Sequence, residues 1–301
     1  MINQIPHVIP YQGSKRKIAA AILDYVDFEI DTLYEPFAGS AAITLAAASR
    51  NLAKSYILGE KLISLAQLWE IIINDPNKII REYTRYWVEQ SANPKEYYLK
   101  VRKHYNKSKS PSALFYLIAR CVKNSIRFNP SGEFNQSADN RRLGMKPEKL
   151  RKEVAKVSKL LQGKTEVISG DFREVLQTAT ASDLVYLDPP WSGLGDNPRY
   201  AYLLDLNSLI DELRVLNKKN IPYLLSLDGS CGDKTYEINL PNDLDLIRVP
   251  IHAGKSTQAT LLGRTAITIE SLYLSPALRN KEKKASPFVH EEKYSQLLLA
   301  S

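Results

Sequence analysis

The sequence predicts an α/β fold in which a mostly parallel sheet is interrupted by a helical insert. Three observations favour this fold. Short strand-like runs alternate with a helical run near the N-terminus, the pattern becomes helical between residues 76 and 163, and strand-like runs resume at residue 166. At 301 residues the chain holds one large domain or two ordinary ones, and a hydrophobic content of 44% is enough for a substantial core.

The first expected elements form a strand–helix–strand unit. Residues 32–35 predict a short strand, residues 41–49 a helix of small residues, and residues 55–58 a second strand. This order favours parallel strands joined by helical crossovers. In such sheets, ligands bind beyond the carboxyl ends of the strands.

The insert and the later strands complete the expected fold. Gly163 is a plausible end for the last helix of the insert. We expect residues 1–75 and 166–275 to form one domain, residues 76–165 to be inserted into it, and residues 276–301 to be a loosely held polar tail. Helices are expected at residues 77–89, 94–105, 112–125 and 147–162, and strands at residues 166–169, 183–187, 223–227, 246–250 and 268–274.

The positive charge of the chain is concentrated in the insert. Residues 76–165 contain 21 Lys and Arg against 7 Asp and Glu, or +14, which leaves 8 − 14 = −6 for the rest of the chain. A basic segment attracts polyanions, and phosphate contacts supply most non-specific nucleic-acid affinity. A solvated helical surface is the alternative. The insert also carries a glycine turn with flanking arginines, which favours a nucleic-acid partner.

Other features exclude several classes of protein. No run of about 18 apolar residues predicts a membrane span, and the N-terminus lacks the layout of a signal peptide. Cys121 and Cys231 are too few for a disulfide framework or a cysteine zinc site, and the four histidines show no metal-ligand spacing. We therefore expect a cytoplasmic protein that needs no metal.

The most informative residues are Asp188-Pro189-Pro190-Trp191, which follow the apolar run at residues 184–187. An amino group conjugated to a nucleobase is a poor nucleophile, so a catalyst must hold its hydrogens on fixed acceptors. Asp188 and the carbonyl of Pro189 are such acceptors, and Trp191 offers an indole face on which a base can stack. A strand that ends in a Pro-Pro turn, with Trp191 in the core, is the alternative for these four residues alone.

A second candidate site lies at the end of the first expected strand. Gly39 permits a close approach of the backbone to a ligand, and the following helix directs its free N–H groups there. Glu60, just after the second strand, is placed to bind both hydroxyls of a ribose. The alternatives are tight helix–sheet packing around Ala41 and Ala42 and a surface position for Glu60.

The N-terminal segment at residues 10–17 combines an aromatic ring, a turn glycine and three basic side chains. Lys15 is placed to neutralise a carboxylate, and Tyr11 to pack against an adenosyl or methionine group. An exposed basic turn is the alternative, and these residues alone favour it.

In this order the motifs resemble the Dam-like, alpha-group family of adenine-specific DNA methyltransferases, which use S-adenosylmethionine. The resemblance runs from about residue 10 to residue 274 and consists of Pro-Tyr-x-Gly-Ser-Lys, Glu-Pro-Phe-x-Gly, an acid after a strand, a basic insert, Ser-Gly-Asp-Phe and Asp-Pro-Pro-aromatic. It implies a Rossmann-like methyltransferase sheet with an inserted, mostly helical DNA-recognition domain, and hence transfer of a methyl group to the 6-amino group of adenine in duplex DNA.

The resemblance also implies which residues bind the cofactor. The loop with Gly39 would lie against the methionine part, and Glu60 would hold the ribose. Asp171 would accept a hydrogen bond from the adenine amino group, with Phe172 beside the ring. The implied set is Tyr11, Lys15, Phe37, Gly39, Glu60, Asp171, Phe172 and Asp188.

For the catalytic motif, the resemblance implies that Asp188 and Pro189 orient the target amino group for in-line attack on the sulfonium methyl. Trp191 would stack on the flipped base. The implied catalytic set is Asp188, Pro189, Pro190 and Trp191.

Three positions depart from the family pattern. Ala41 stands where a second glycine is usual, Leu62 where a polar residue is common, and Trp191 where tyrosine is commoner. Since indole has the larger stacking face, the last change preserves stacking.

Target recognition is assigned by the resemblance to the insert. Residues 127–135 look like the turn that precedes the DNA-recognition hairpin of the family. Arginine can read guanine and asparagine adenine, whereas phosphate contacts only position the protein. A basic loop at residues 254–264 is a further candidate for backbone contacts. The implied DNA-binding residues are Arg127, Asn135, Arg141 and Arg142.

The expected partners follow from this hypothesis. They are double-stranded DNA and, for a modification enzyme, a cognate restriction endonuclease; the protein is expected to be a monomer. The same chemistry on cytosine or on RNA remains an alternative, because each target presents an amino group to Asp188. A DNA-binding protein whose sheet domain has lost catalysis is another, although Asp171, Asp188 and both prolines are intact.

Overall fold

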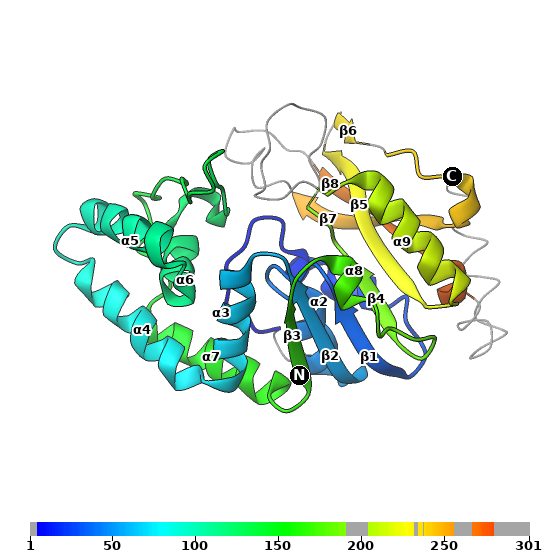
Figure 1. The fold of residues 1–301 in the computed structure, drawn as a ribbon, viewed down its shortest axis with the longest axis horizontal. Coiled ribbons are helices and arrows are strands. Elements are labelled where there is room, and N and C mark those ends of the chain that lie inside the picture. The colour runs from blue at the N-terminus through cyan, green and yellow to red at the C-terminus, as the bar shows by residue number, and fades with distance from the viewer. Residues whose placement is uncertain (1–4, 191–203, 232–233, 237, 256–266, 280–301) are drawn as a thin grey trace.

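The computed structural model describes residues 5–190, 204–231, 234–236, 238–255 and 267–279. Within them, one mostly parallel sheet of eight strands forms the body of the protein (Figure 1). Its main path runs β3-β2-β1-β4-β5-β8-β7, and β6 pairs with β5. The strands are β1 (Ile30–Glu35), β2 (Ala53–Glu60), β3 (Thr165–Ser169), β4 (Leu184–Leu187), β5 (Tyr223–Cys231), β6 (Lys234–Tyr236), β7 (Ile247–Lys255) and β8 (Ile267–Leu274).

The strand order reverses between β1 and β4, and this reversal positions the site. The chain runs from β1 outward to β2 and β3, and then returns to β4 and β5 on the other side of β1. These five strands are parallel to their neighbours, whereas β8 is antiparallel to both β5 and β7. The carboxyl ends of β1 to β4 therefore meet at one edge, beside the switch point where α/β sheets bind ligands.

Helices cover both faces of the sheet, and each face has its own core. Along β4, Leu184 and Tyr186 belong to one buried cluster, while Val185 and Leu187 belong to the other. This alternation follows from the two-residue period of a strand. The helices are η1 (Lys15–Lys17), α1 (Ala19–Leu23), α2 (Ala42–Arg50), α3 (Ile63–Asn74), α4 (Pro76–Glu89), α5 (Pro94–Ser108), α6 (Pro111–Arg120), η2 (Val122–Asn124), α7 (Pro147–Leu161), α8 (Phe172–Val175), α9 (Leu206–Lys218) and η3 (Asn242–Leu244).

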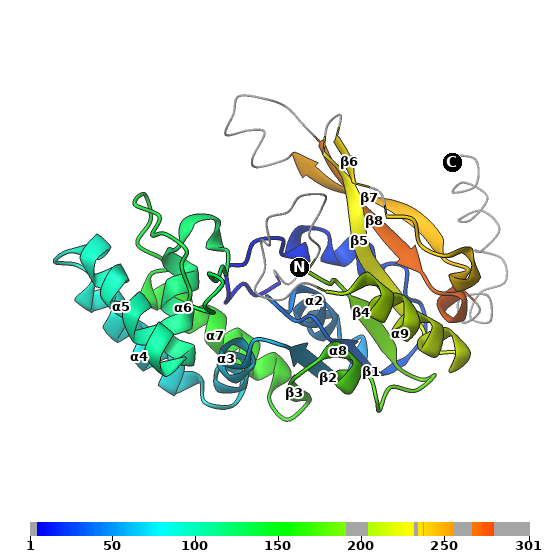
Figure 2. The same cartoon turned by 45° about the horizontal axis from the view of Figure 1, so that its top comes forward.

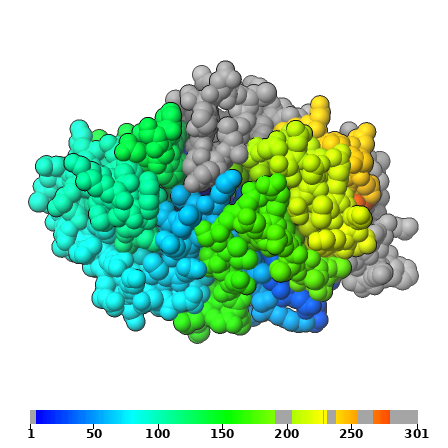
Figure 3. Space-filling model, viewed as in Figure 1, coloured from blue at the N-terminus to red at the C-terminus, as the bar shows by residue number. Residues whose placement is uncertain are grey.

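The insert helices lie to one side of the sheet, in the chain between β2 and β3 (Figure 2). Three of them begin at a capping side chain followed by proline: Asp75 accepts from Lys78 N–H, and Asn93 and Ser110 play the same part for α5 and α6. In the space-filling view, the insert in cyan and green forms one end of the molecule (Figure 3). Ser158 of α7 donates to the carbonyl of Ile73 in α3 at 2.8 Å, which ties the insert to the body.

Every strand predicted from the sequence is present, and the α/β fold class is confirmed. The prediction of one helix over residues 112–125 is wrong at its end. Helix α6 stops at Arg120, and the turn that follows holds Lys123 and Asn124 at φ +61° and +52°. Helices α1, α3, α8 and α9 and strand β6 were not predicted.

At the start of the expected loose tail, Ala277 and Leu278 are buried. Residues 280–301 lie outside the described residues.

Candidate active site

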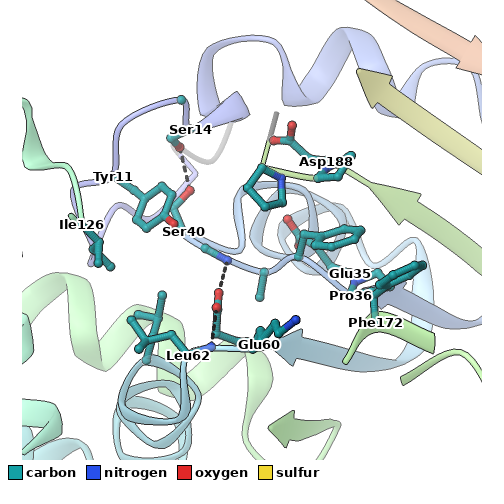
Figure 4. A pocket seen from close by; sticks show the side chains of 18 of the residues that line it. Tyr11, Ser14, Glu35, Pro36, Ser40, Glu60, Leu62, Ile126, Phe172 and Asp188 are labelled. Carbon is teal, nitrogen blue, oxygen red and sulfur yellow. Dashed lines mark hydrogen bonds between the residues drawn. The ribbon is translucent and has the colours of Figure 1, made fainter. Parts of the chain in front are cut away.

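A pocket opens beyond the carboxyl ends of β1, β2, β3 and β4, and it gathers the predicted motifs (Figure 4). The lining residues come mainly from the N-terminal segment, the loops after these strands and the first turns of α2 and α3, and Ile126 comes from the insert. All eight predicted cofactor residues line the pocket, and so do three of the four residues of the catalytic motif, Asp188 being common to both sets: Tyr11, Lys15, Phe37, Gly39, Glu60, Asp171, Phe172, Asp188, Pro189 and Pro190.

The loop after β1 has a left-handed backbone at Gly39 and again at Ala41, with φ of +45° and +48°. A Cβ atom on Gly39 would lie 3.1 Å from the ring of Tyr11, so glycine allows the aromatic ring to approach the loop. Trp69 of α3 donates its indole N–H to the carbonyl of Gly39 at 2.9 Å. The family pattern has glycine at position 41, and the positive φ explains this, because alanine adopts such a backbone only with steric strain.

Glu60 ends β2 with its carboxylate held by two backbone N–H groups. Oε2 accepts from Gly39 at 3.2 Å, and Oε1 accepts from Leu62 at 3.0 Å. Burial raises the pKa of Glu60, while these hydrogen bonds oppose the shift. Each oxygen keeps a lone pair for a further donor, which is the arrangement that a pair of ribose hydroxyls requires.

Asp171 and Phe172 follow β3 at the adjoining wall of the pocket. Asp171 caps α8, and its Oδ1 accepts from the side chain of Arg173 at 2.8 Å. That contact, with Lys61 nearby, lowers the pKa of Asp171. The rings of Phe37 and Phe172 stack with centroids 5.2 Å apart, and together they form an aromatic surface beside the Asp171 carboxylate.

Glu35 is a buried acid that the sequence did not mark as a site residue. Its carboxylate accepts from the backbone N–H of Thr44 at 2.8 Å and of Ile43 at 3.4 Å, so it caps the first turn of α2. Burial nevertheless raises the pKa of Glu35 to about 7. Glu35 also lines the pocket.

Asp188 faces the pocket at the end of β4 and is paired with Lys15. Lys15 Nζ lies 2.9 Å from Asp188 Oδ1, and 3.2 Å from Oε2 of Glu270 in β8. Burial raises the pKa of Asp188, and the Lys15 ammonium opposes that rise. Burial alone lowers the pKa of Lys15, but the two carboxylates outweigh it and the pKa is raised. Lys15 thus neutralises carboxylates of the protein itself, those of Asp188 and Glu270.

The two prolines after Asp188 also line the pocket. Pro189 is buried, and its ring fixes the backbone that carries its carbonyl. Trp191 lies outside the described residues, as does most of the basic loop at residues 254–264.

Two of the four predicted DNA-binding residues meet at a single carboxylate. Asp139 is 3% exposed, and it accepts from the side chains of Arg141 at 3.2 Å and of Arg142 at 2.9 Å. Arg141 contributes most to the depressed pKa of Asp139, which is about 2. The arginine side chains themselves are exposed, so Asp139 holds the base of an outward-facing cationic pair.

Arg127 and Asn135 lie across the turn that precedes this pair. The Asn135 N–H donates to the Arg127 carbonyl at 3.0 Å, and Gly132 takes φ +73° in the turn between them. Asn135 is exposed, whereas Arg127 is partly buried and its Nε atom has no hydrogen-bond partner. The structure thus groups the four residues in one region of the insert.

Sequence reasoning missed several residues that shape the pocket. Ile126 brings the insert into the pocket wall, and Gln12 N–H donates to the Asn124 carbonyl at 3.1 Å beside it. Trp69 and Glu270 act on the site from α3 and β8. A detectable signal existed for Glu270, because it is the one charged residue in the run from Thr268 to Leu274, which was expected to be a strand.

Within the described ranges, no group of three or more His, Cys, Asp or Glu side chains is arranged to hold a metal ion. Nor is any helix in that part of the chain long and apolar enough to cross a membrane.

Comparison with known proteins gives a family match and several relatives. The family model for D12 class N6 adenine-specific DNA methyltransferases matches residues 11–221. A Type II methyltransferase of Methanocaldococcus jannaschii is 26% identical over 209 residues, which are 64% of this chain and 71% of the relative. The DNA N-6-adenine-methyltransferase of Escherichia phage P1 is 27% identical over 62% of this chain, but this is only 24% of its own length. The DNA adenine methylase of Serratia marcescens is 26% identical over 60% of this chain and 66% of its own.

Proposed function

The chain belongs to the D12 class N6 adenine-specific DNA methyltransferase family, and from this premise we propose how its pocket works. The pocket transfers the methyl group of S-adenosylmethionine to N6 of an adenine flipped out of duplex DNA. The observation that carries the proposal is that Asp188 lies in the same pocket as Glu60 and Asp171, at the edge where the parallel strands end.

The residues present fit S-adenosylmethionine. Glu60, oriented by two backbone N–H groups, suits the ribose hydroxyls. Asp171 and the stacked rings of Phe37 and Phe172 suit an adenine ring with an amino group. When bound, the cofactor would supply an electrophilic sulfonium methyl group to N6, and the methylated nitrogen, which is acidic, would then lose one proton.

Asp188 is the residue that acts on the target base. It accepts a hydrogen bond from the amino group and so points the nitrogen lone pair along the line of attack, while the carbonyl of Pro189 accepts the second hydrogen. Lys15 favours the ionised form of Asp188, which is the better acceptor. Trp191 follows directly in the sequence, and its proposed task is to stack on the flipped base.

The insert, residues 76–165, is proposed as the target-recognition domain on the catalytic body of residues 1–75 and 166–275. Its charge of +14, from 21 − 7, supports contact with DNA phosphates. Arg127, Asn135, Arg141 and Arg142 are the residues proposed to contact DNA.

The remaining proposals concern the oligomeric state, the location and the partners of the enzyme. We propose that the enzyme acts as a monomer in the cytoplasm, with the cellular DNA as its substrate. One relative is named a Type II methyltransferase, which supports a cognate restriction endonuclease as partner.

Incubation of the purified chain with S-adenosylmethionine labelled in the methyl group tests the proposal. Duplex DNA and RNA are compared as substrates, and the digested product is resolved into N6-methyladenine and N4-methylcytosine. We expect label in N6-methyladenine from duplex DNA, and we expect Asp188→Ala to abolish it while DNA binding persists. Label confined to RNA or to cytosine would overturn the proposal.

Base flipping is tested separately. Single-molecule sequencing of DNA from cells that express the protein identifies the target sequence, and 2-aminopurine is then placed at the target adenine. Its fluorescence should rise on binding, because an extruded base is no longer stacked. Unchanged fluorescence would contradict flipping.

A further inference from the structure

Glu270 contacts the catalytic centre from outside it. It lies on β8, beyond the residues that the family model matches, and among the described residues it is not part of the pocket wall. Its Oε2 atom is 3.2 Å from Lys15 Nζ, which lies 2.9 Å from Asp188 Oδ1 and 3.5 Å from the Gly13 carbonyl oxygen. An ammonium group has three N–H donors. These three acceptors therefore fix its direction.

The sheet brings Glu270 to this place through a close approach of two strands. Glu270 pairs with Gly229 across the antiparallel β5–β8 ladder, next to an irregularity in register between Ser226 and Gly229. A Cβ atom on Gly229 would lie 2.3 Å from the carbonyl oxygen of Ile269 and 3.1 Å from Cα of Glu270. Only glycine permits this close approach of the two strands, and the approach holds the backbone of Glu270 in its observed position.

We propose that Glu270 is a positioning residue for methyl transfer: it holds the Lys15 ammonium against Asp188, so that Asp188 keeps the orientation in which it accepts from the target amino group. The inference rests on the proposed function, because Asp188 is the residue that binds that amino group. Lys15 is only 12% exposed, so its ammonium has few other partners in water. Without Glu270, one of its two carboxylate contacts is lost and the lysine side chain gains freedom to turn away from Asp188.

The charged groups around Asp188 determine how its pKa should change when Glu270 is substituted. Lys15 on η1 stabilises the carboxylate, whereas Glu270 on β8 disfavours it by like charge. Glu35 on β1 also interacts with Asp188, and burial together with the like charge raises the pKa of Glu35. Tyr186 on β4 is neutral in the working range, because burial raises the pKa of its phenol and its hydroxyl donates to Ser226 at 3.0 Å. Removing the charge of Glu270 while keeping its shape should therefore lower the pKa of Asp188.

Two substitutions of Glu270 separate position from charge. Glu270→Gln keeps an oxygen that accepts from Lys15, whereas Glu270→Ala removes the contact. Glu166→Gln, on the edge strand β3 of the same sheet, is the matched control. For each protein, kcat, KM for S-adenosylmethionine, KM for duplex DNA and the pH profile of kcat are measured.

We expect Glu270→Ala to lower kcat about ten- to a hundredfold, as a small misplacement of a reacting group does, with both KM values close to those of the wild type. Glu270→Gln should retain most of kcat, with the acidic limb of the profile moved to lower pH. Glu166→Gln should match the wild type. The inference would be overturned if both Glu270 variants kept the kcat and the pH profile of the wild type. It would also be overturned if both variants lost kcat equally and the loss matched a loss of folded protein.

A measurement without turnover keeps this inference separate from the proposed function. The carboxyl carbon of Asp188 is followed by NMR through a pH titration and assigned by its absence in Asp188→Asn. Its pKa should fall in Glu270→Gln relative to the wild type and should stay unchanged in Glu166→Gln. An inactive wild type with this shift contradicts only the proposed function, whereas an active wild type without it contradicts only the role of Glu270.

Discussion

The Glu60 carboxylate accepts a hydrogen bond from the backbone N–H of Gly39, 3.2 Å away across the pocket edge (Figure 4). Because the other oxygen accepts from Leu62, the carboxylate is oriented before any ligand arrives. Glu60 thus joins the loop after β1 to the start of α3.

We predict that Glu60→Gln weakens binding of S-adenosylmethionine by about ten- to a hundredfold, the range for losing hydrogen bonds to a charged group. The amide can accept from only one of the two backbone N–H groups and turns its own N–H₂ toward the other. Isothermal titration calorimetry measures the change. DNA binding, measured in parallel by fluorescence anisotropy, should be unaffected, and undiminished cofactor affinity would remove Glu60 from the site.

Gly39→Ala should damage cofactor binding through Tyr11. The added Cβ would lie 3.1 Å from the tyrosine ring, at a residue whose φ is +45°. Gly163→Ala is the matched control, because Gly163 has φ +74° but no atom within 4 Å of an added Cβ. Both variants should lose about 1–2 kcal/mol of unfolding free energy from the left-handed backbone. Only Gly39→Ala should also bind S-adenosylmethionine more weakly, and equal affinity in the two variants would show that Tyr11 is not needed.

The paired arginines on Asp139 predict a change in the salt dependence of DNA binding. Replacing Arg141 and Arg142 together by alanine should lower the slope of log K against log salt by about 1.8, if each neutralises one phosphate. Arg214→Ala, on α9 and paired with Asp211 and Asp243, serves as control and should leave the slope unchanged. An unaltered slope in the double variant would place the pair away from phosphates.

The sequence predicted those elements whose local residue pattern matches their environment in the folded protein. The run from Leu184 to Leu187 is apolar because both faces of β4 are covered, and Asp75, Asn93 and Ser110 mark helix starts by their own side chains. Helix α3 lacks the capping signal, because its N-cap, Leu62, makes no side-chain hydrogen bond. Its buried residues recur at helical spacing, as Leu65, Leu68, Trp69 and Ile72 do, but no polar residue marks where the helix begins.

The residues of the candidate site likewise divide into those that the sequence predicted and those that only the structure identifies. Gly39, Glu60, Asp171 and Asp188 could be predicted because each lies within four residues of the end of a predicted strand, where a parallel sheet gathers its ligand-binding loops. Trp69 and Glu270 reach the site through a helix and a strand distant in sequence, so only the packed structure brings them there. The pairing of both arginines with Asp139 likewise depends on how one turn folds back on itself.

The last prediction concerns stability and pH, and it follows from Glu35. The folded state raises the pKa of this carboxyl to about 7 through burial, from an unfolded value near 4.5. Between these two values the folded protein binds more protons than the unfolded chain, so the free energy of unfolding falls as pH rises through the window. From pH 5 to pH 8 this group should remove about 2–3 kcal/mol, at 1.36 kcal/mol per pKa unit. Urea denaturation at both pH values should show a smaller decline in Glu35→Gln than in the wild type. Glu166→Gln controls for an ordinary exposed acid, and an identical decline in all three proteins would mean that Glu35 ionises in the folded state as it does in water.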